Sequence, residues 1–454
     1  MRADLASPDS GDAARGLRGC LVTGRPGQKV IDDGTVVIAG ERILWCGPTA
    51  ELPAGVAVET EQVPVILPGL VDVHCHGGVG HTFGADADGA RRAAAFHAAQ
   101  GTTSVLASLV SAPSSVLLEQ IAVLRELVQD GTLAGLHLEG PFITKSMCGA
   151  QDPHAIIDGD PVLLQQWFEA GQGTVRSLTL APETAHFAEL VDLCRSYSVV
   201  PSLGHTDATA SLTRKVLADA VTGVPAGGQG GGDADGGFGG TRGRWSATHL
   251  FNRMPPLGHR TPGPIPVLLQ AAQQSPEQMV LELVADGVHL DPEIVRMVFG
   301  LVGPGAVALV TDAMAAAGMT DGHYTLGRLD VLVQDGVARL VPAGDQGHHG
   351  AIAGATSLLL ENLRRCVQWG VPLADAVMAA SASPARLMGL DRPGPAEVGA
   401  KTGANQIGAA PVGSIAEGYR ADVLVATEDL DLIQAYRAGR PLTHERNARA
   451  DYSV

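Results

Sequence analysis

Six side chains able to bind a metal or transfer a proton stand where apolar, strand-like runs of the sequence end. They are His74 and His76 in VDVHCH, Glu139 in HLEG, His205 in LGH, His249 in ATH and Asp312 in VTD. Residues two apart on a strand point to the same face, so the imidazoles of His74 and His76 can bind one ion. Four imidazoles and two carboxylates suit zinc or another divalent transition metal, which predicts a metal-dependent hydrolase.

The elements that position these side chains alternate along residues 65–400. Eight apolar runs are typical of β-strands, and segments such as 115–129 and 292–301 carry apolar residues three and four positions apart, as helices do. Eight buried strands, most followed by a helix, predict an α/β fold with a closed parallel (β/α)8 TIM-like barrel, whose active site lies at the carboxyl ends of the strands. An open doubly wound sheet is the alternative, but no Gly-x-Gly-x-x-Gly turn follows the first strand.

Two shorter β-rich segments flank the predicted barrel, at residues 19–64 and 405–450. Gly and Asp turns separate their β-branched runs, as in a small antiparallel sheet. Because the two ends of a chain often lie close together, we expect both segments to form one small domain, a β-sandwich built from both termini.

Composition excludes several other classes of protein. The 454 residues include 58 Gly and 28 Pro, too many for a coiled coil or a long-helix bundle, and 45% hydrophobic residues are too many for a disordered chain. A net charge of −17 without a run of Lys or Arg argues against a nucleic-acid partner. Glycine dominates residues 226–243, which we expect to be a solvent-exposed insertion, with a mobile lid as the alternative.

Cellular location is also constrained. No apolar stretch approaches the ~18 residues that a membrane span needs, so no membrane partner is expected. No signal peptide is recognisable, and the six cysteines are scattered without a CxxC pair. We therefore expect a cytoplasmic protein with reduced thiols.

The motifs around the six side chains resemble the amidohydrolase superfamily and, within it, the N-acetylglucosamine-6-phosphate deacetylases. They are PGLVDVHCHGG, HLEGPF, LGHTDA, THLFN-M, VADGVH and LVTDAMAAAG, and the similarity runs from about residue 20 to residue 440. HLEGPF together with THLFN-M is specific to these deacetylases. The resemblance implies a metal-dependent barrel with a small β-domain, usually a homodimer, that removes the acetyl group of a phosphorylated amino sugar, N-acetylglucosamine 6-phosphate.

The resemblance also assigns metal ligands. Glu139, His205 and His249 match the family's principal ligands, whereas His74 and His76 match a pair that completes a second metal site in some members. One or two divalent ions per subunit, zinc foremost, are therefore expected.

Asp312 matches the family's catalytic carboxylate. The reaction implied is hydrolysis of an acetamide, in which the metal activates a water molecule and polarises the carbonyl. Asp312 would accept the proton of the water and then deliver it to the departing nitrogen. The alternative for Asp312 is a purely structural role, as the N-cap of a helix that begins at AMAAAG.

Five further residues match substrate contacts of the family. Arg260 matches its phosphate-binding arginine, and Asn252 and His289 match residues on the sugar-phosphate side, the histidine sometimes acting across the dimer interface. Ala353 and Gly354, in AIAGATSLL, would supply backbone and room beside the N-acetyl group.

Two residues depart from the family pattern. Arg253 stands where Ala usually follows HLFN, and it would add a cation near the phosphate. Gln151 stands where many members have a substrate-contacting His; it can still hydrogen-bond to sugar hydroxyls but cannot carry charge. On the same loop, Cys148 is expected to be an ordinary cysteine, with a reactive thiol over the site as the alternative.

Two other functions remain open from the sequence. One is a different amidohydrolase, such as a dihydroorotase, hydantoinase or deaminase; the cyclic amidases with two metals generally bridge them with a carboxylated lysine, a place that Glu139 takes here. The other is a non-catalytic barrel kept as an assembly module, but such proteins lose metal ligands and this chain keeps all of them.

Overall fold

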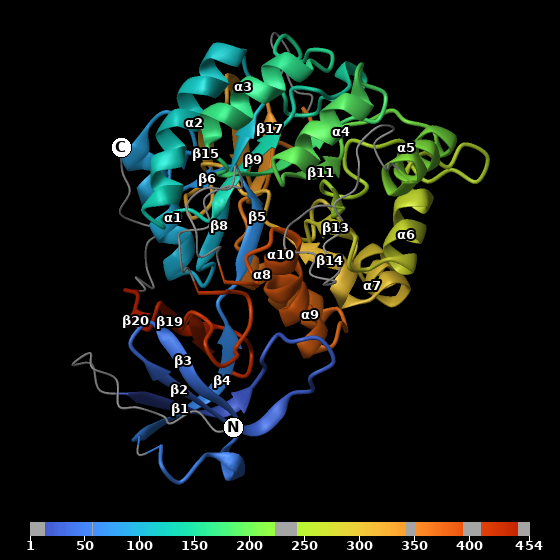
Figure 1. Ribbon diagram of the computed structural model, residues 1–454. Coiled ribbons are helices and arrows are strands. Elements are labelled where there is room, and N and C mark those ends of the chain that lie inside the picture. The colour runs from blue at the N-terminus through green and yellow to red at the C-terminus, as the bar shows by residue number, and fades with distance from the viewer. Residues whose placement is uncertain (1–13, 57, 223–242, 342–349, 394–409, 444–454) are drawn as a thin grey trace.

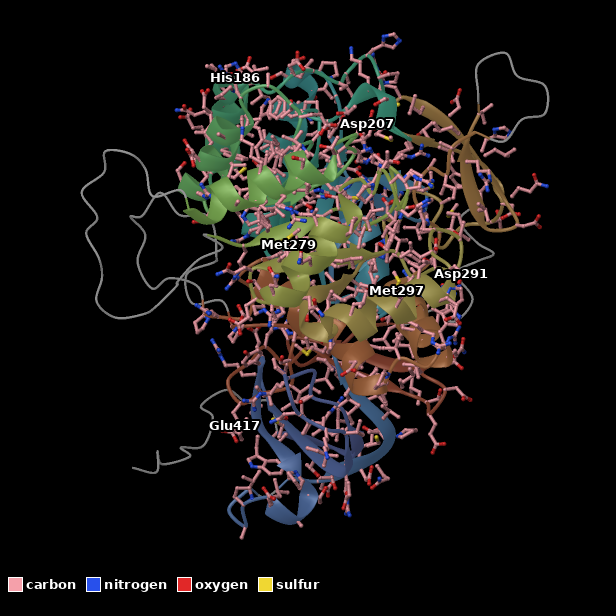
Figure 2. The ribbon with its side chains drawn as sticks, turned by 90° about the vertical axis from the view of Figure 1, so that its right-hand side faces the viewer. His186, Asp207, Met279, Asp291, Met297 and Glu417 are labelled. Atoms are coloured by element: carbon pink, nitrogen blue, oxygen red, sulfur yellow. The ribbon has the colours of Figure 1, made fainter. Side chains whose placement is uncertain are left out.

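The computed structural model describes residues 14–56, 58–222, 243–341, 350–393 and 410–443. The chain forms a large barrel and a smaller sheet beside it (Figure 1). Figure 2 shows the same division, with the N-terminal strands at one end, Glu417 beside them, and Met279 and Met297 in the barrel part. The predicted glycine-rich insertion lies outside the described residues, apart from Gly243.

Eight parallel strands form the barrel, and each pairs with the next one along the chain. They are β5 (Val71–Cys75), β8 (Ser104–Val110), β9 (Gly135–Glu139), β10 (Val175–Leu180), β11 (Val200–Leu203), β12 (Trp245–Ala247), β13 (Met279–Leu283) and β14 (Val307–Leu309). The barrel is nearly closed, because Cys75 at the end of β5 bridges in parallel to Ala313 after β14. The (β/α)8 barrel predicted from the eight apolar runs is confirmed.

Burial explains why these strands are so apolar. Every residue is buried in seven of the eight strands, since one face fills the barrel and the other meets the surrounding helices. The described α-helices, seen around the strands in Figure 1, are α1 (Ala87–Ala99), α2 (Ser114–Gln129), α3 (Pro161–Gly171), α4 (Phe187–Ser196), α5 (Ala210–Thr222), α6 (Ile265–Gln274), α7 (Pro292–Val302), α8 (Leu359–Gln368), α9 (Leu373–Ala380) and α10 (Ala382–Leu387).

Helix α7 illustrates how the sequence specifies such a helix. Asp291 caps its first turn by accepting a hydrogen bond from the Glu293 amide at 2.8 Å, and Pro292 occupies the first helical position. The buried residues, Val295, Val298, Phe299 and Val302, follow the spacing of one helical face.

Two small antiparallel sheets interrupt the alternation of strands and helices. One is the hairpin β6 (Gly77–Gly78) and β7 (His81–Thr82). The other, inserted between β14 and α8, consists of β15 (Gly322–Leu326), β16 (Leu329–Gln334) and β17 (Val337–Leu340). The sequence analysis did not predict this three-stranded sheet, which packs on its own apolar cluster with Met314 and Ala353. Short 3₁₀ turns are formed by Thr49–Glu51, Lys145–Met147 and Pro304–Ala306.

Both ends of the chain build the small sheet, as predicted. Its strands, in spatial order, are β20 (Arg440–Pro441), β19 (Leu432–Arg437), β18 (Val423–Ala426), β4 (Thr60–Pro68), β1 (Arg15–Leu21), β2 (Ile31–Ala39) and β3 (Arg42–Pro48). Its strands pair antiparallel, as expected, except that β1 and β4 pair in parallel, so the sheet is mixed rather than antiparallel throughout. The sheet also curls on itself: a Cβ added to Gly439 would lie 2.0 Å from the carbonyl oxygen of Gly40, so the β2–β3 and β19–β20 turns touch.

Arginines fasten this sheet to the barrel. The Arg437 side chain donates to the carbonyl of Thr103, just before β8, at 2.9 Å, and Arg420 donates to the Ser104 hydroxyl at the same distance. The six cysteines are all free. Within the described part of the chain, no helix has the length and apolar character needed to cross a membrane.

Candidate metal centre and substrate cavity

The five predicted metal ligands meet at the carboxyl ends of the barrel strands. They form two triads, His74–His76–Glu139 and Glu139–His205–His249, and within each triad the candidate ligand atoms lie within 4.8 Å of one another. All five residues are buried, and Glu139 belongs to both triads. The structure therefore offers two adjacent ligand sets around one shared carboxylate.

The backbone is strained where these residues leave their strands. His205 and His249, each two residues beyond the end of its strand, have φ angles of 48° and 29°, and Asp312 has a φ of 51°. Non-glycine residues rarely adopt this left-handed region, and such strain persists only where the surrounding structure imposes it. In these positions the strand ends turn the three side chains into the same buried centre.

The carboxylate of Glu139 lies between the imidazoles. Its Oε1 is 2.9 Å from Nε2 of His205 and 3.1 Å from Nε2 of His249, and its Oε2 is 3.2 Å from Nε2 of His76. The imidazole nitrogens also approach one another, with 3.0 Å between Nε2 of His205 and His249 and 3.2 Å between Nε2 of His74 and His76.

The hydrogen bonds of the Nδ1 atoms indicate which ring nitrogens are available to bind a metal. Nδ1 of His76 donates to the Ser108 carbonyl at 3.1 Å, and Nδ1 of His205 donates to the Met147 carbonyl at 2.9 Å. A neutral imidazole whose Nδ1 carries the proton presents a lone pair at Nε2. In their neutral forms, His74 and His76, whose Nδ1 atoms face the Glu282 carboxylate and the Ser108 carbonyl, would point their Nε2 lone pairs at one another across 3.2 Å. A cation between the two nitrogens removes this repulsion, so the pair fits a divalent metal.

The field of the carboxylates also favours positive charge at this centre. Burial alone would lower the pKa of His74, but Asp312 and Glu139 outweigh it and raise this pKa well above its usual value. Burial would raise the pKa of Asp312, but His74 and His76 hold it below its usual value. Oδ1 of Asp312 lies 3.3 Å from Nε2 of His76, so this carboxylate adjoins the metal centre.

Two buried acids that the sequence analysis missed support the histidines from behind. Oε2 of Glu282 accepts from Nδ1 of His74 at 3.1 Å and from the His249 amide at 3.3 Å. Oδ1 of Asp72 accepts from the His74 amide at 3.2 Å, and burial raises the pKa of Asp72 to about 6 although a hydrogen bond from Thr311 opposes this. The sequence could have indicated both residues, because Asp72 and Glu282 are each the only charged residue within an apolar, strand-like run.

A third missed residue, His137, lies beside His74 with 4.6 Å between the ring centres. Its two nitrogens contact the hydroxyls of Ser108 at 2.9 Å and Thr179 at 2.8 Å. Burial, and then the charge of His74, lower the pKa of His137 well below its usual value, so it stays neutral. His137 is thus a satisfied core histidine of the barrel interior.

A cavity of about 200 Å³ opens onto the metal centre. Of the residues predicted to contact substrate, Gln151, Asn252, Arg253, His289 and Gly354 line it. Four other lining residues were missed by the sequence analysis: Ala150, Phe251, Leu326 and Ile352. Leu326 ends strand β15, so the unpredicted three-stranded sheet supplies part of the cavity wall.

Two predicted substrate residues lie off this lining. Arg260 is exposed, and Ala353 is fully buried between two residues that do line the cavity. The structure therefore does not bring Arg260 to the cavity of its own chain.

Two basic side chains face the cavity besides the metal triads. His289 contacts Oδ2 of Asp286 through Nδ1 at 2.8 Å; burial lowers the pKa of His289, but Asp286 outweighs it and raises this pKa above its usual value. Arg253 has a φ of 52°. Its side chain packs against Gly149, because a Cβ added to Gly149 would lie 2.6 Å from Nε of Arg253. Among the described residues, the Arg253 guanidinium has no hydrogen-bond or ion-pair partner.

Comparison with known proteins identifies the relatives of this chain. No protein-family model matches it. The N-acetylglucosamine-6-phosphate deacetylase of Bacillus subtilis (strain 168) is 30% identical over 357 residues, which are 76% of this chain and 81% of that protein. The chain belongs to the N-acetylglucosamine-6-phosphate deacetylase family of the amidohydrolase superfamily. It is therefore a hydrolase.

Other relatives of this deacetylase-family chain agree. The N-acetylgalactosamine-6-phosphate deacetylase of Escherichia coli O157:H7 is 29% identical, over 86% of this chain and 90% of that protein. A Mycobacterium smegmatis N-acetyl-D-glucosamine-6-phosphate deacetylase mutant, solved in complex with N-acetyl-D-glucosamine-6-phosphate, is 33% identical with a TM-score of 0.77, over 95% of this chain and all of that one. The Thermotoga maritima N-acetylglucosamine-6-phosphate deacetylase is 27% identical with a TM-score of 0.72, over 94% of this chain and 99% of that one.

Because Glu139 belongs to both triads and His76 to only one, we expect their replacement to reduce the metal content by different amounts. We expect His76→Ala to lose one bound zinc ion per chain and to keep the other, whereas Glu139→Ala should lose both. Metal content is measured by mass spectrometry after desalting of zinc-loaded protein. The exposed His186→Ala serves as a control and should keep the full content. Full zinc content in Glu139→Ala would contradict the shared site.

Proposed function

We propose that this protein hydrolyses the acetamide of N-acetylglucosamine 6-phosphate to glucosamine 6-phosphate and acetate. The observation that carries the proposal is one cavity that adjoins both a buried His/Glu metal centre with a carboxylate and two basic side chains, Arg253 and His289. An N-acetylated sugar phosphate carries both an amide to be cleaved and an anion to be held. Relatives about 30% identical are named for this reaction.

Asp312 is the proposed acid–base group. A divalent ion held by the two triads would lower the pKa of a bound water molecule and polarise the amide carbonyl. The lowered pKa of Asp312 keeps the carboxylate ionised at neutral pH, ready to accept the proton of the attacking water. The same carboxylate would then deliver this proton to the amide nitrogen, which leaves as the amine of the sugar.

The remaining cavity residues are proposed to orient the substrate. The planar guanidinium of Arg253 suits phosphate oxygens, and His289, which contacts Asp286 through Nδ1, would add a second contact. Asn252 is fixed by a hydrogen bond from its Nδ2 to the His249 carbonyl at 3.2 Å, which leaves its Oδ1 to accept from the sugar. Gly354, whose added Cβ would lie 2.8 Å from the Asp312 carbonyl oxygen, leaves room for the acetyl group.

Arg260 remains a predicted phosphate ligand. Its exposed position means that a loop movement, or a second copy of the chain, must bring it to the substrate. The predicted homodimer would provide such a second copy. The metal is proposed to be zinc, because each triad offers two imidazoles and one carboxylate, a set of ligands that zinc prefers.

Acetate release tests the proposed function. Zinc-loaded protein is given N-acetylglucosamine 6-phosphate, its 4-epimer N-acetylgalactosamine 6-phosphate, unphosphorylated N-acetylglucosamine, and the cyclic amides dihydroorotate and hydantoin. We expect release from the phosphorylated sugars, and little from the unphosphorylated one. Hydrolysis of a cyclic amide without release of acetate would overturn the proposal in favour of another amidohydrolase activity.

Replacement of Asp312 separates its chemistry from its structural role. We expect Asp312→Asn to fold and to bind zinc, while kcat falls by about 10²- to 10⁴-fold because the proton acceptor is lost. The exposed Asp207→Asn, close to His205 in the chain, is the matched control and should keep its kcat. A kcat near that of the unaltered protein in Asp312→Asn would remove Asp312 from the acid–base role.

Replacement of the arginines locates the phosphate. Because the phosphate is remote from the amide, Arg253→Ala should mainly raise KM for the phosphorylated sugar, by roughly 10- to 100-fold for a charged hydrogen bond, with little change in kcat. Arg260→Ala should raise the same KM if a second chain or a loop movement delivers it. The exposed Arg296→Ala is the control. An unchanged KM in either variant excludes that arginine from the phosphate site.

A further inference from the structure

The side-chain amide of Gln151 makes two hydrogen bonds within the protein, one through each end. Its Oε1 accepts from the Ser111 backbone amide at 2.6 Å, and its Nε2 donates to Oε2 of Glu139 at 2.5 Å. A backbone N–H can only donate and a carboxylate accepts, so these partners fix which end of the amide is oxygen. Gln151 is 3% exposed, and this residue was predicted from the sequence to contact the sugar.

Ser111 also binds Glu139, through the backbone of that residue. Its hydroxyl donates to the Glu139 carbonyl at 3.1 Å, and a Cβ on the neighbouring Gly140 would come within 2.3 Å of this hydroxyl oxygen. Glu139 is therefore bound at its backbone by Ser111 and at its side chain by Gln151. These contacts determine how the shared carboxylate is turned between the two triads.

We propose that Gln151 is a positioning residue that holds the Glu139 carboxylate in the orientation that both triads require. With Nε2 of Gln151 bound to Oε2, the other oxygen, Oε1, is turned toward His205 and His249. Without this hydrogen bond the carboxylate can rotate about its terminal bond, since that torsion is soft. Gln151 thereby supports metal binding without adding charge to the centre.

The two triads become unequal as a result. Oε2 shares its lone pairs with the Gln151 amide and faces His76, whereas Oε1 faces two imidazoles at 2.9 and 3.1 Å and takes no hydrogen bond from Gln151. A carboxylate lone pair that accepts a hydrogen bond is less available to a metal ion. The triad of Glu139, His205 and His249 is therefore the tighter of the two sites.

Gln151 also closes the loop that supports this tighter triad. Its backbone amide donates to the Cys148 carbonyl at 3.0 Å, and the Met147 carbonyl accepts from Nδ1 of His205. A single stretch of chain, residues 147–151, thus holds the Glu139 carboxylate at one end and the His205 imidazole at the other. This inference rests on the proposed metal-dependent function, but it concerns metal binding alone and needs no substrate.

Zinc affinity of three variants tests the proposal. Dissociation constants are measured by competition with a chromophoric chelator, without substrate, on full-length protein. In Gln151→Leu we expect the affinity of the tighter site to fall by about 10- to 100-fold. Gln151→His can accept from Ser111 and donate to Glu139 through its two ring nitrogens, so it should stay within about threefold of the unaltered protein. Cys148→Ala, in the same loop, is the matched control.

The outcomes separate positioning from substrate contact. If Gln151→Leu binds zinc as the unaltered protein does and only its KM rises, Gln151 is a sugar contact and the proposal is wrong. If Gln151→His loses zinc as the Leu variant does, the hydrogen-bond donor is not what matters, which also overturns it. Because these titrations use zinc alone, they can succeed even if no acetate is released, so failure of the proposed function is recognised separately.

Discussion

The structure depends on one buried carboxylate placed among four imidazoles. Glu139 is 3% exposed, and burial would raise its pKa, but His74, His205 and His249 hold this pKa well below its usual value. An ionised carboxylate without water is costly unless charged or hydrogen-bonding partners surround it. Strand ends, strained backbone angles and the loop around Gln151 all serve to surround Glu139 in this way. A bound divalent ion would complete the compensation that the protein groups begin.

Features that depend on local sequence were predictable. The eight barrel strands are continuous apolar runs, and the five predicted ligands lie within two residues of the carboxyl ends of their strands, so residue type and position sufficed to predict the two triads. The sheet β15–β17 was not predicted, because it is inserted between β14 and α8 and is not part of the alternation of strands and helices from which the barrel was predicted. The Gln151 contact was also missed, since it depends on how a loop folds back onto Glu139. Arg260 is a motif residue whose place in space the motif does not determine.

Charge in this protein is organised locally rather than overall. The chain carries a net charge of −17, yet the cavity is lined by Arg253, which has no partner among the described residues, and by His289, whose pKa Asp286 raises although burial opposes this. A repulsive mean field disfavours polyanions in general, whereas a small anion can still be bound where few cations line an enclosed space. The proposed substrate, a small phosphate ester, suits such an arrangement better than an extended polymer would.

Strands from both ends of the chain form the small sheet, so this sheet can be completed only after synthesis has reached the C-terminal strands. Strand β4 has its partner β18 far along the chain, and the contact between Gly40 and Gly439 joins the two ends of the protein. While the ribosome is still making the barrel, the edge of β4 that faces β18 remains unpaired, and exposed strand edges invite association with other chains. The last strands to emerge therefore protect the first, and a chain that stops before residue 423 leaves an adhesive edge on an otherwise complete barrel.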